Sequence, residues 1–249
     1  MSEVQTRKKN EISANMFETD AGQGIANITQ EDLALPFLKV LGQLSPEVNK
    51  RNAKYVEGAE PGMIINTVTN EIFDGEKGID VVPVYYKRQH IEWQDRGESQ
   101  GAPVKIYEAG DDLPKTSRDK FNKDRLANGN YLENTASHFV VVLGKNPTTA
   151  LISMKATQLK VSRKWNSMMM GLKMQGKNGM FTPPTYSHIY KLKLYNSLMT
   201  RVHGLVGMFL KLDQSLIRVF IQSPRTLVIA LLKEMSRLNT KLKRLENKE

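Results

Sequence analysis

Hydrophobic and polar residues alternate along several stretches of the chain, as they do in half-buried β-strands. Runs rich in β-branched and aromatic residues predict strands at 63–68, 79–93, 138–143, 148–154 and 187–195. Pro83 lies inside the longest run, and a proline within a strand indicates an edge position or a β-bulge. Gly144-Lys-Asn-Pro147 joins the third and fourth runs, so these two strands should form a hairpin.

The clearest helix is predicted from Thr157 to Met174, because its apolar residues recur at helical spacing. This apolar stripe consists of Val161, Trp165, Met168 and Leu172. At about 100° per residue, a second, polar and basic stripe lies roughly 120° from the first. It consists of Lys160, Arg163, Lys164 and Ser167. We therefore expect a helix that packs on the strands by one side and displays cations on another.

Two further segments have weaker patterns. Residues 29–41 predict a short helix or an irregular apolar strap, which starts at the capping residue Thr29. Residues 94–133 are charged and contain several glycines, and they predict a long loop with a short helix near Arg118–Leu126.

The order of these elements is strand, strand, loop, strand, strand, helix, strand. It predicts a mainly β (α+β) fold, an OB-like antiparallel barrel with one packed helix. This domain would cover residues 29–195, after a disordered, flexible arm at 1–28. An atypical basic, leucine-rich C-terminal segment follows at 196–249.

Charge is distributed unevenly along the chain, whose formal net charge is +10. Residues 1–133 hold 17 Lys+Arg and 22 Asp+Glu, whereas residues 134–195 hold nine basic residues and no acidic one. Solvated surfaces usually mix both signs. The acid-free block therefore favours a polyanionic partner, most simply nucleic acid, with a basic face that has no ligand as the alternative.

Composition narrows the chemistry further. The absence of cysteine excludes disulfides, thiolate metal sites and thiol nucleophiles. The four histidines do not stand at metal-ligand spacing, so we expect no metal and no cofactor. No apolar run approaches the roughly 18 residues of a membrane helix, and the start has no signal-peptide core. We expect a cytoplasmic protein with no membrane partner.

Single-stranded nucleic acids bind where cations hold the phosphates and aromatic rings stack on the bases. The candidate phosphate ligands are Lys87, Arg88, Lys155, Lys160, Arg163, Lys164, Lys173, Lys177, Lys191 and Lys193. The candidate stacking rings are Tyr85, Tyr86, Trp93, Trp165, Tyr186 and Tyr190. Each ring could instead be part of the core, above all Trp165, which belongs to the apolar stripe. The methionines at 168–170, 174 and 180 predict core packing.

Evidence for catalysis is weak. The sequence contains no phosphate loop, dinucleotide fingerprint, serine-hydrolase elbow, zinc-protease motif or kinase signature. A metal-dependent nuclease or resolvase would need clustered carboxylates, for which the first half offers Glu71, Asp74, Asp80, Glu92 and Asp95. We expect no enzyme, and keep such a nuclease and a structural or partner-binding protein as alternatives.

Four segments resemble the single-stranded DNA-binding proteins of tailed phages of the podovirus type: Asp32–Lys39, Pro61–Ile72, Gly78–Val84 and Thr182–Tyr190. The likeness runs from about residue 29 to 195. The resemblance implies a protein of phage replication or recombination that coats single-stranded DNA without cutting it. It also implies an oligonucleotide-binding barrel, phage replication proteins as further partners, and an acidic C-terminal tail.

The C-terminal segment departs from that family pattern, because it is basic and rich in leucine. Back-translation of Met199–Leu210 in the −1 frame can give Asn-Asp-Lys-Gly-Ser-Trp-Phe-Gly-Trp-Asn-Val-Ser, and the end of the chain can give a glutamate-rich run. An aromatic strand and an acidic tail are what the resemblance implies there. We hypothesise a frameshift near residues 194–198.

The nucleotide sequence of the gene tests this hypothesis. We expect the −1 frame to stay open beyond codon 198 and to encode the aromatic strand followed by the acidic tail. An early stop codon in that frame would rule the hypothesis out.

Overall fold

The computed structural model describes residues 32–95, 102–144, 147–196, 208–212 and 218–219. The chain divides into two compact units, Met1–Ala34 and Leu35–Glu249. The second unit contains all the elements described below. The predicted arm at 1–28, the proposed helix start at Thr29 and most of the segment 196–249 lie outside the described residues.

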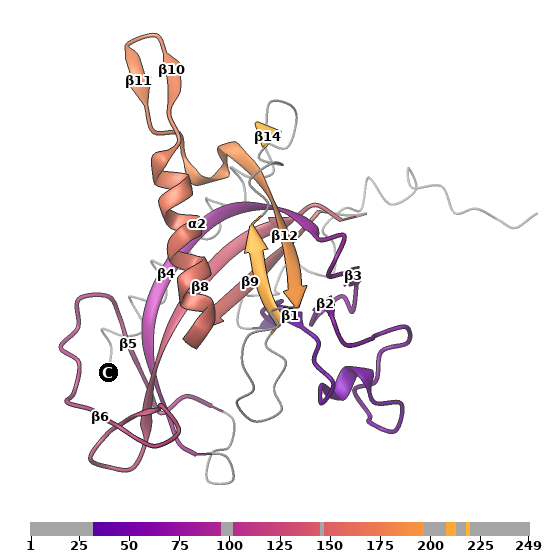
Figure 1. The fold of residues 1–249 in the computed structure, drawn as a ribbon, viewed down its shortest axis with the longest axis vertical. Helices are drawn as coiled ribbons and strands as arrows, with labels where there is room; N and C mark the ends of the chain where they lie inside the picture. Colours follow the sequence, from indigo (N-terminus) through magenta and orange to yellow (C-terminus); the bar gives the residue numbers. More distant parts are fainter. Residues whose placement is uncertain (1–31, 96–101, 145–146, 197–207, 213–217, 220–249) are drawn as a thin grey trace, which may run out of the picture. The chain divides into compact units, whose positions relative to one another are not determined.

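The described part of the chain is mainly β with one α-helix, α2 (Leu159–Gly171), which confirms the predicted fold class (Figure 1). Short 3₁₀ helices are η2 (Pro46–Val48), η3 (Ala156–Gln158) and η4 (Thr185–Ser187). The strands are β1 (Leu38–Val40), β2 (Met63–Asn66), β3 (Ile72–Asp74), β4 (Ile79–Trp93), β5 (Lys105–Tyr107), β6 (Ser117–Arg118), β7 (Asp124–Arg125), β8 (Tyr131–Val142), β9 (Thr148–Lys155), β10 (Met174–Gly176), β11 (Gly179–Phe181), β12 (His188–Asn196), β13 (Met208–Leu212) and β14 (Arg218–Val219).

The large sheet is built on the long strand β4. Antiparallel pairing gives the order β9-β8-β4-β12-β13, with β5 beside β4, β7 and β6 beyond β8, and β14 beside β12. The predicted β8–β9 hairpin is confirmed, and β4 has the predicted extent. The bulge expected at Pro83 is also confirmed, because the register of β4 against β8 shifts between Pro83 and Tyr85.

The strand ladders of the described residues do not close into a barrel. The small antiparallel sheet β1-β2-β3 instead contacts the large sheet at two places through backbone hydrogen bonds. Leu151 N on β9 donates to Pro36 O at 2.8 Å, and Leu194 N on β12 donates to Gly75 O at 2.8 Å. Gly75 is required at this contact, since a Cβ there would lie 2.1 Å from Gly62 O.

Two local predictions need correction. The helix predicted near Arg118–Leu126 is wrong, because β6 and β7 form a hairpin there. The Asp119 carboxylate accepts the backbone N–H groups of Phe121 and Lys123 at 2.8 and 2.9 Å, and Asn122 has a φ of 59°. Such side-chain-to-backbone bonds compete with helix formation. For 29–41 the helix alternative is wrong in the described part, because residues 38–40 form the strand β1, while residues 34–36 have no regular structure, as in the irregular strap.

The main core lies between the large sheet and α2. It joins aliphatic residues of β4, β8, β9 and β12 to Trp165 and Met169 of the helix. At its centre Trp165 stacks on His138 of β8, with ring centroids 4.5 Å apart and an interplanar angle of 18°. His138 Nε2 is 2.8 Å from Ser162 Oγ, and all three side chains are buried. The helix is thus held by ring stacking and by a hydrogen bond between buried polar groups.

This burial makes stability depend on pH. Desolvation lowers the pKa of His138 from 6.5 to about 4, so the folded protein binds no proton there in the interval in which the unfolded chain does. Stability should therefore fall as the pH falls from 6.5 to 4, by up to about 3 kcal/mol for this group.

Urea unfolding at several pH values measures the effect. His138→Gln removes the titrating group, so its free energy of unfolding should change less over this interval than that of the wild type. His90 and His188, whose pKa values burial also lowers, are present in both proteins and cancel in the comparison. Equal pH dependence of the two proteins would contradict the assignment.

Candidate nucleic-acid interface

The helix α2 turns a different side to the sheet from the one that the sequence predicted. Its buried residues are Ser162, Trp165 and Met169, whereas Val161, Met168 and Leu172 of the predicted apolar stripe are only partly buried. At about 100° per residue, the buried side is rotated by roughly 60° from that stripe. The rotation places Ser162, a polar residue, against His138.

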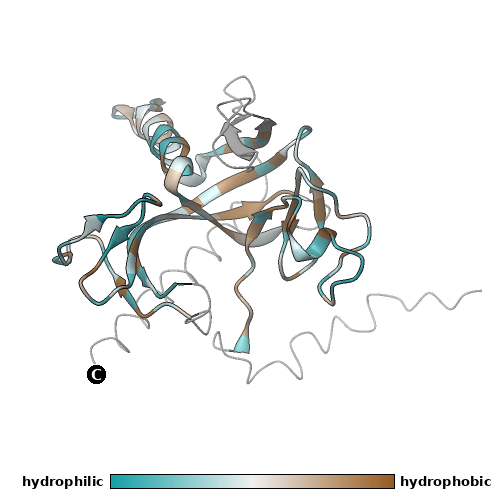
Figure 2. Ribbon diagram, turned by 60° about the horizontal axis from the view of Figure 1, so that its bottom comes forward, coloured by the Kyte–Doolittle hydropathy of each residue, from teal (hydrophilic) through white to brown (hydrophobic). Residues whose placement is uncertain are grey.

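The opposite side of α2 is basic and exposed. This side carries the residues of the predicted polar stripe, Lys160, Arg163, Lys164 and Ser167. Exposed Met170, one turn further along the helix, lies on the same side. In Figure 2 the ribbon of α2 includes several teal turns, whereas the strands of the large sheet include long brown segments. Lys160, Arg163 and Lys164 form no ion pair or side-chain hydrogen bond with any residue in the described ranges.

A short hairpin, β10–β11, follows the helix and projects beyond its end (Figure 1). It carries exposed Lys177, and Lys173 precedes it, with Nζ donating to Thr182 Oγ1 at 2.5 Å. We call Lys160, Arg163, Lys164, Lys173 and Lys177, with exposed Met170, Met180 and Phe181, the helix–hairpin surface.

The methionine prediction holds only in part. Met169 is buried and Met168 is partly buried against the core, but Met170 is 71% exposed and Met180 is 64% exposed. Core packing is therefore wrong for these two residues, because Met170 lies on the outer side of α2 and Met180 lies on the projecting hairpin. Phe181, which sequence reasoning did not consider, is 45% exposed on the same hairpin as Met180.

The predicted cations on the strands have partners. Lys87 pairs with Glu108 at 2.7 Å, Lys155 with Glu133 at 3.0 Å and Lys191 with Asp80 at 2.8 Å. Arg88 Nε donates to Asn134 Oδ1 at 3.1 Å, and Lys193 is half-buried on β12. Two lysines of the acid-free block, Lys155 and Lys191, are therefore compensated by acids from residues 1–133, because antiparallel pairing brings their strands together.

Most of the predicted stacking rings lie in the interior. Trp165 and Tyr190 are fully buried, and their rings meet edge to face with centroids 5.7 Å apart. Tyr86 is partly buried against His138, at 4.9 Å between centroids. Trp93 is half-buried, and Tyr186 packs on the second cluster of Val82, Val84 and Val141. Trp165 and Tyr190 therefore offer no ring face at the surface.

Tyr85 is the most exposed of the predicted rings, at 37%, and its ring centroid is 5.7 Å from that of Phe139. Tyr85 pairs with Phe139 and Tyr86 with His138, in successive register positions of β4 and β8. Successive residues of a strand point to opposite faces. Since His138 faces α2, the Tyr85–Phe139 pair lies on the other face, and the structure does not bring it together with the helix–hairpin surface.

The candidate carboxylates of a nuclease are engaged separately. Buried Glu92 accepts hydrogen bonds from Asn130, Asn128 and Tyr107, and those bonds, led by the one from Asn130, lower its pKa. Asp95 pairs with Arg125 and Lys123, whose hydrogen bonds lower the pKa of Asp95. In the part of the chain that the structure describes, no group of three or more His, Asp or Glu residues could hold a metal ion.

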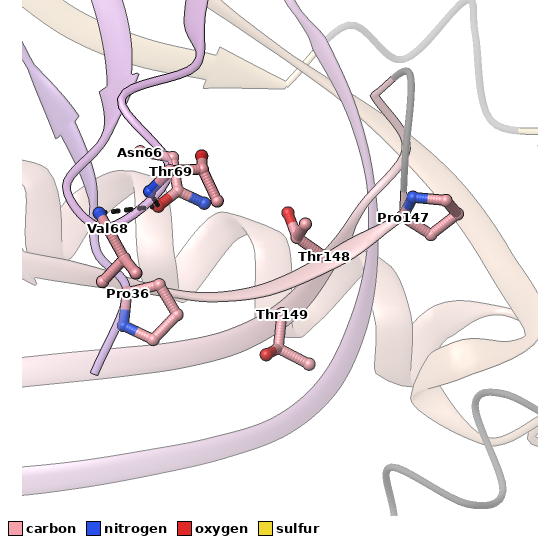
Figure 3. A pocket seen from close by; sticks show the side chains of 7 residues that line it. All are labelled: Pro36, Asn66, Val68, Thr69, Pro147, Thr148 and Thr149. Atoms are coloured by element: carbon pink, nitrogen blue, oxygen red, sulfur yellow. Dashed lines mark hydrogen bonds between the residues drawn. The ribbon is translucent and has the colours of Figure 1, made fainter. Parts of the chain in front are cut away.

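A pocket of about 330 Å³ lies between the β2–β3 turn and the start of β9 (Figure 3). Its lining of prolines, threonines, Val68 and Asn66 contains no charged residue. Asn66 Oδ1 accepts the backbone N–H groups of Val68 and Thr69 at 3.0 and 3.2 Å, which fixes the orientation of its amide. Because it lacks cations, this pocket does not match the chemistry of a phosphate.

Comparison with known protein families identifies the family of this chain. The family model described as Pam3 phage gp34-like protein matches residues 7–198, so residues 199–249 lie beyond it. No curated protein and no solved structure matches the chain. Among the described residues, no helix is long and apolar enough to span a membrane. The phage origin implied by the resemblance is confirmed, and the chain belongs to the Pam3 phage gp34-like protein family.

Proposed function

We propose that this phage protein binds single-stranded DNA without catalysis and that α2 contacts the phosphates. The observation that carries the proposal is the set of three cations, Lys160, Arg163 and Lys164, that no described residue neutralises. Cations that line one side of an element can follow a phosphate backbone and release its counterions.

The position of these cations on the helix strengthens the argument. Lys160 stands in the first turn of α2, which contains no acidic residue and no side-chain cap. The N-terminal end of a helix carries partial positive charge, so a cation there costs about 0.3–1 kcal/mol where an anion would be favourable. A phosphate beside Lys160, Arg163 and Lys164 would remove this repulsion.

The order of the strands supports the same function. An OB barrel, the five-stranded fold that commonly binds oligonucleotides, arranges its strands in the order 3-2-1-4-5 and often has a helix before the fourth. Strands β9-β8-β4-β12-β13 follow this order, and α2 lies between β9 and β12 in the chain.

The protein would act in DNA replication or recombination in the host cytoplasm, beside phage replication proteins.

The salt dependence of binding tests the phosphate contacts. If all three cations of α2 contact phosphates, their replacement by alanine should reduce the slope of log affinity against log salt by about two units for single-stranded DNA. The fold should survive, because surface changes usually alter stability by within about 0.5 kcal/mol each. Fluorescence anisotropy with a labelled oligothymidylate at several salt concentrations measures the slope.

The control is Lys50→Ala/Arg51→Ala/Lys54→Ala, which removes the same charge from three exposed residues of the loop after η2. This variant should keep most of the wild-type slope. An unchanged slope in the α2 variant would show that the helix does not contact DNA. Cleavage of the oligonucleotide on addition of Mg²⁺ would contradict the absence of catalysis and favour the nuclease alternative.

A further inference from the structure

The β10–β11 hairpin is built to project from the molecule. Its strands pair Met174 with Phe181, Gln175 with Met180 and Gly176 with Gly179. Gly179 closes the turn with a φ of +110°, a conformation that glycine adopts without strain. Figure 1 shows the hairpin extending from the end of α2, away from the large sheet.

The hairpin presents a supported aromatic ring to solvent. Phe181 lies over the backbone of Gly176, where an added Cβ would be 3.1 Å from Phe181 Cδ1. The ring therefore rests against the partner strand, although Phe181 is 45% exposed and neighbouring Met180 is 64% exposed. An exposed aromatic ring among cations is the combination on which the bases of single-stranded nucleic acid stack.

The surrounding charge selects the partner. Lys173 precedes the hairpin and Lys177 lies in its turn, and the cations of α2 stand on the helix from which the hairpin extends. No acidic residue occurs between residues 134 and 195. A single strand of nucleic acid combines phosphates with unstacked base faces, whereas a duplex keeps its base faces inside.

We infer that Phe181 is a base-stacking site for single-stranded DNA whose phosphates follow Lys173, Lys177 and the cations of α2. This inference rests on the proposed function and adds to it the residues that contact the bases. Stacking on an aromatic ring tolerates every base, because each base has a π-face. The site should therefore contribute affinity without sequence preference.

Tryptophan fluorescence in the full-length chain tests the contact. Phe181→Trp should be quenched by an oligothymidylate, since a stacked base quenches indole emission, and much less by duplex DNA. Phe121→Trp is the matched control, because Phe121 is 69% exposed but lies in the β6–β7 turn. Its signal should change no more than that of the wild type, which reports on buried Trp165 and half-buried Trp93.

Affinity provides the second readout. Phe181→Ala should weaken binding of the oligothymidylate roughly tenfold with an unchanged salt slope, and Phe121→Ala should leave the affinity unchanged. Thermal unfolding by circular dichroism should show that both variants are folded.

Two outcomes overturn the inference, and they can be told apart. If the oligonucleotide binds with normal salt dependence but neither quenches Phe181→Trp nor loses affinity for Phe181→Ala, the stacking site is wrong and the proposed function stands. If the wild type binds no oligonucleotide at low salt, the proposed function fails together with the inference, and an acidic protein would be the partner that fits this surface.

Discussion

Trp165 lies flat on His138, with ring centroids 4.5 Å apart, and this contact fixes how α2 lies on the sheet. Ser162, about one helical turn before Trp165, is hydrogen-bonded to His138. If the helix rotated about its axis, this hydrogen bond would break and leave a buried polar group unpaired. Because this side of α2 is held against β8, Lys160, Arg163 and Lys164 must face away from the core. The buried contact therefore determines the basic surface.

The sheet determines which other cations remain available. Antiparallel pairing places Asp80 of β4 beside Lys191 of β12, and Glu133 of β8 beside Lys155 of β9. Acidic residues from 1–133 thereby partly neutralise the acid-free block at 134–195. The helix–hairpin surface lies on elements without a paired acidic strand, which explains why its charge is uncompensated among the described residues. This uncompensated charge is a consequence of the fold topology as much as of the amino-acid composition.

Local patterns predicted much of the fold, because alternation, turns and proline act over a few residues. The extent of β4, its bulge at Pro83 and the β8–β9 hairpin were all predictable in this way. The rotation of α2 was not, since Ser162 is polar and only its distant partner His138 explains its burial. The basic stripe was predictable, because helical spacing is also a local pattern. The burial of Tyr190 and the pairing of Lys191 were not, because they depend on strands far away in the sequence.

Photo-crosslinking distinguishes the two faces of the sheet most directly. A single-stranded DNA oligonucleotide that carries 5-iodo-2′-deoxyuridine, bound to the wild-type protein and irradiated, should crosslink within residues 159–181, at the helix–hairpin surface. Mass spectrometry of the digested complex would identify the peptide. Crosslinks to exposed Tyr85 or half-buried Phe139, which pair on the opposite face, would contradict the account and assign DNA binding to the strands instead.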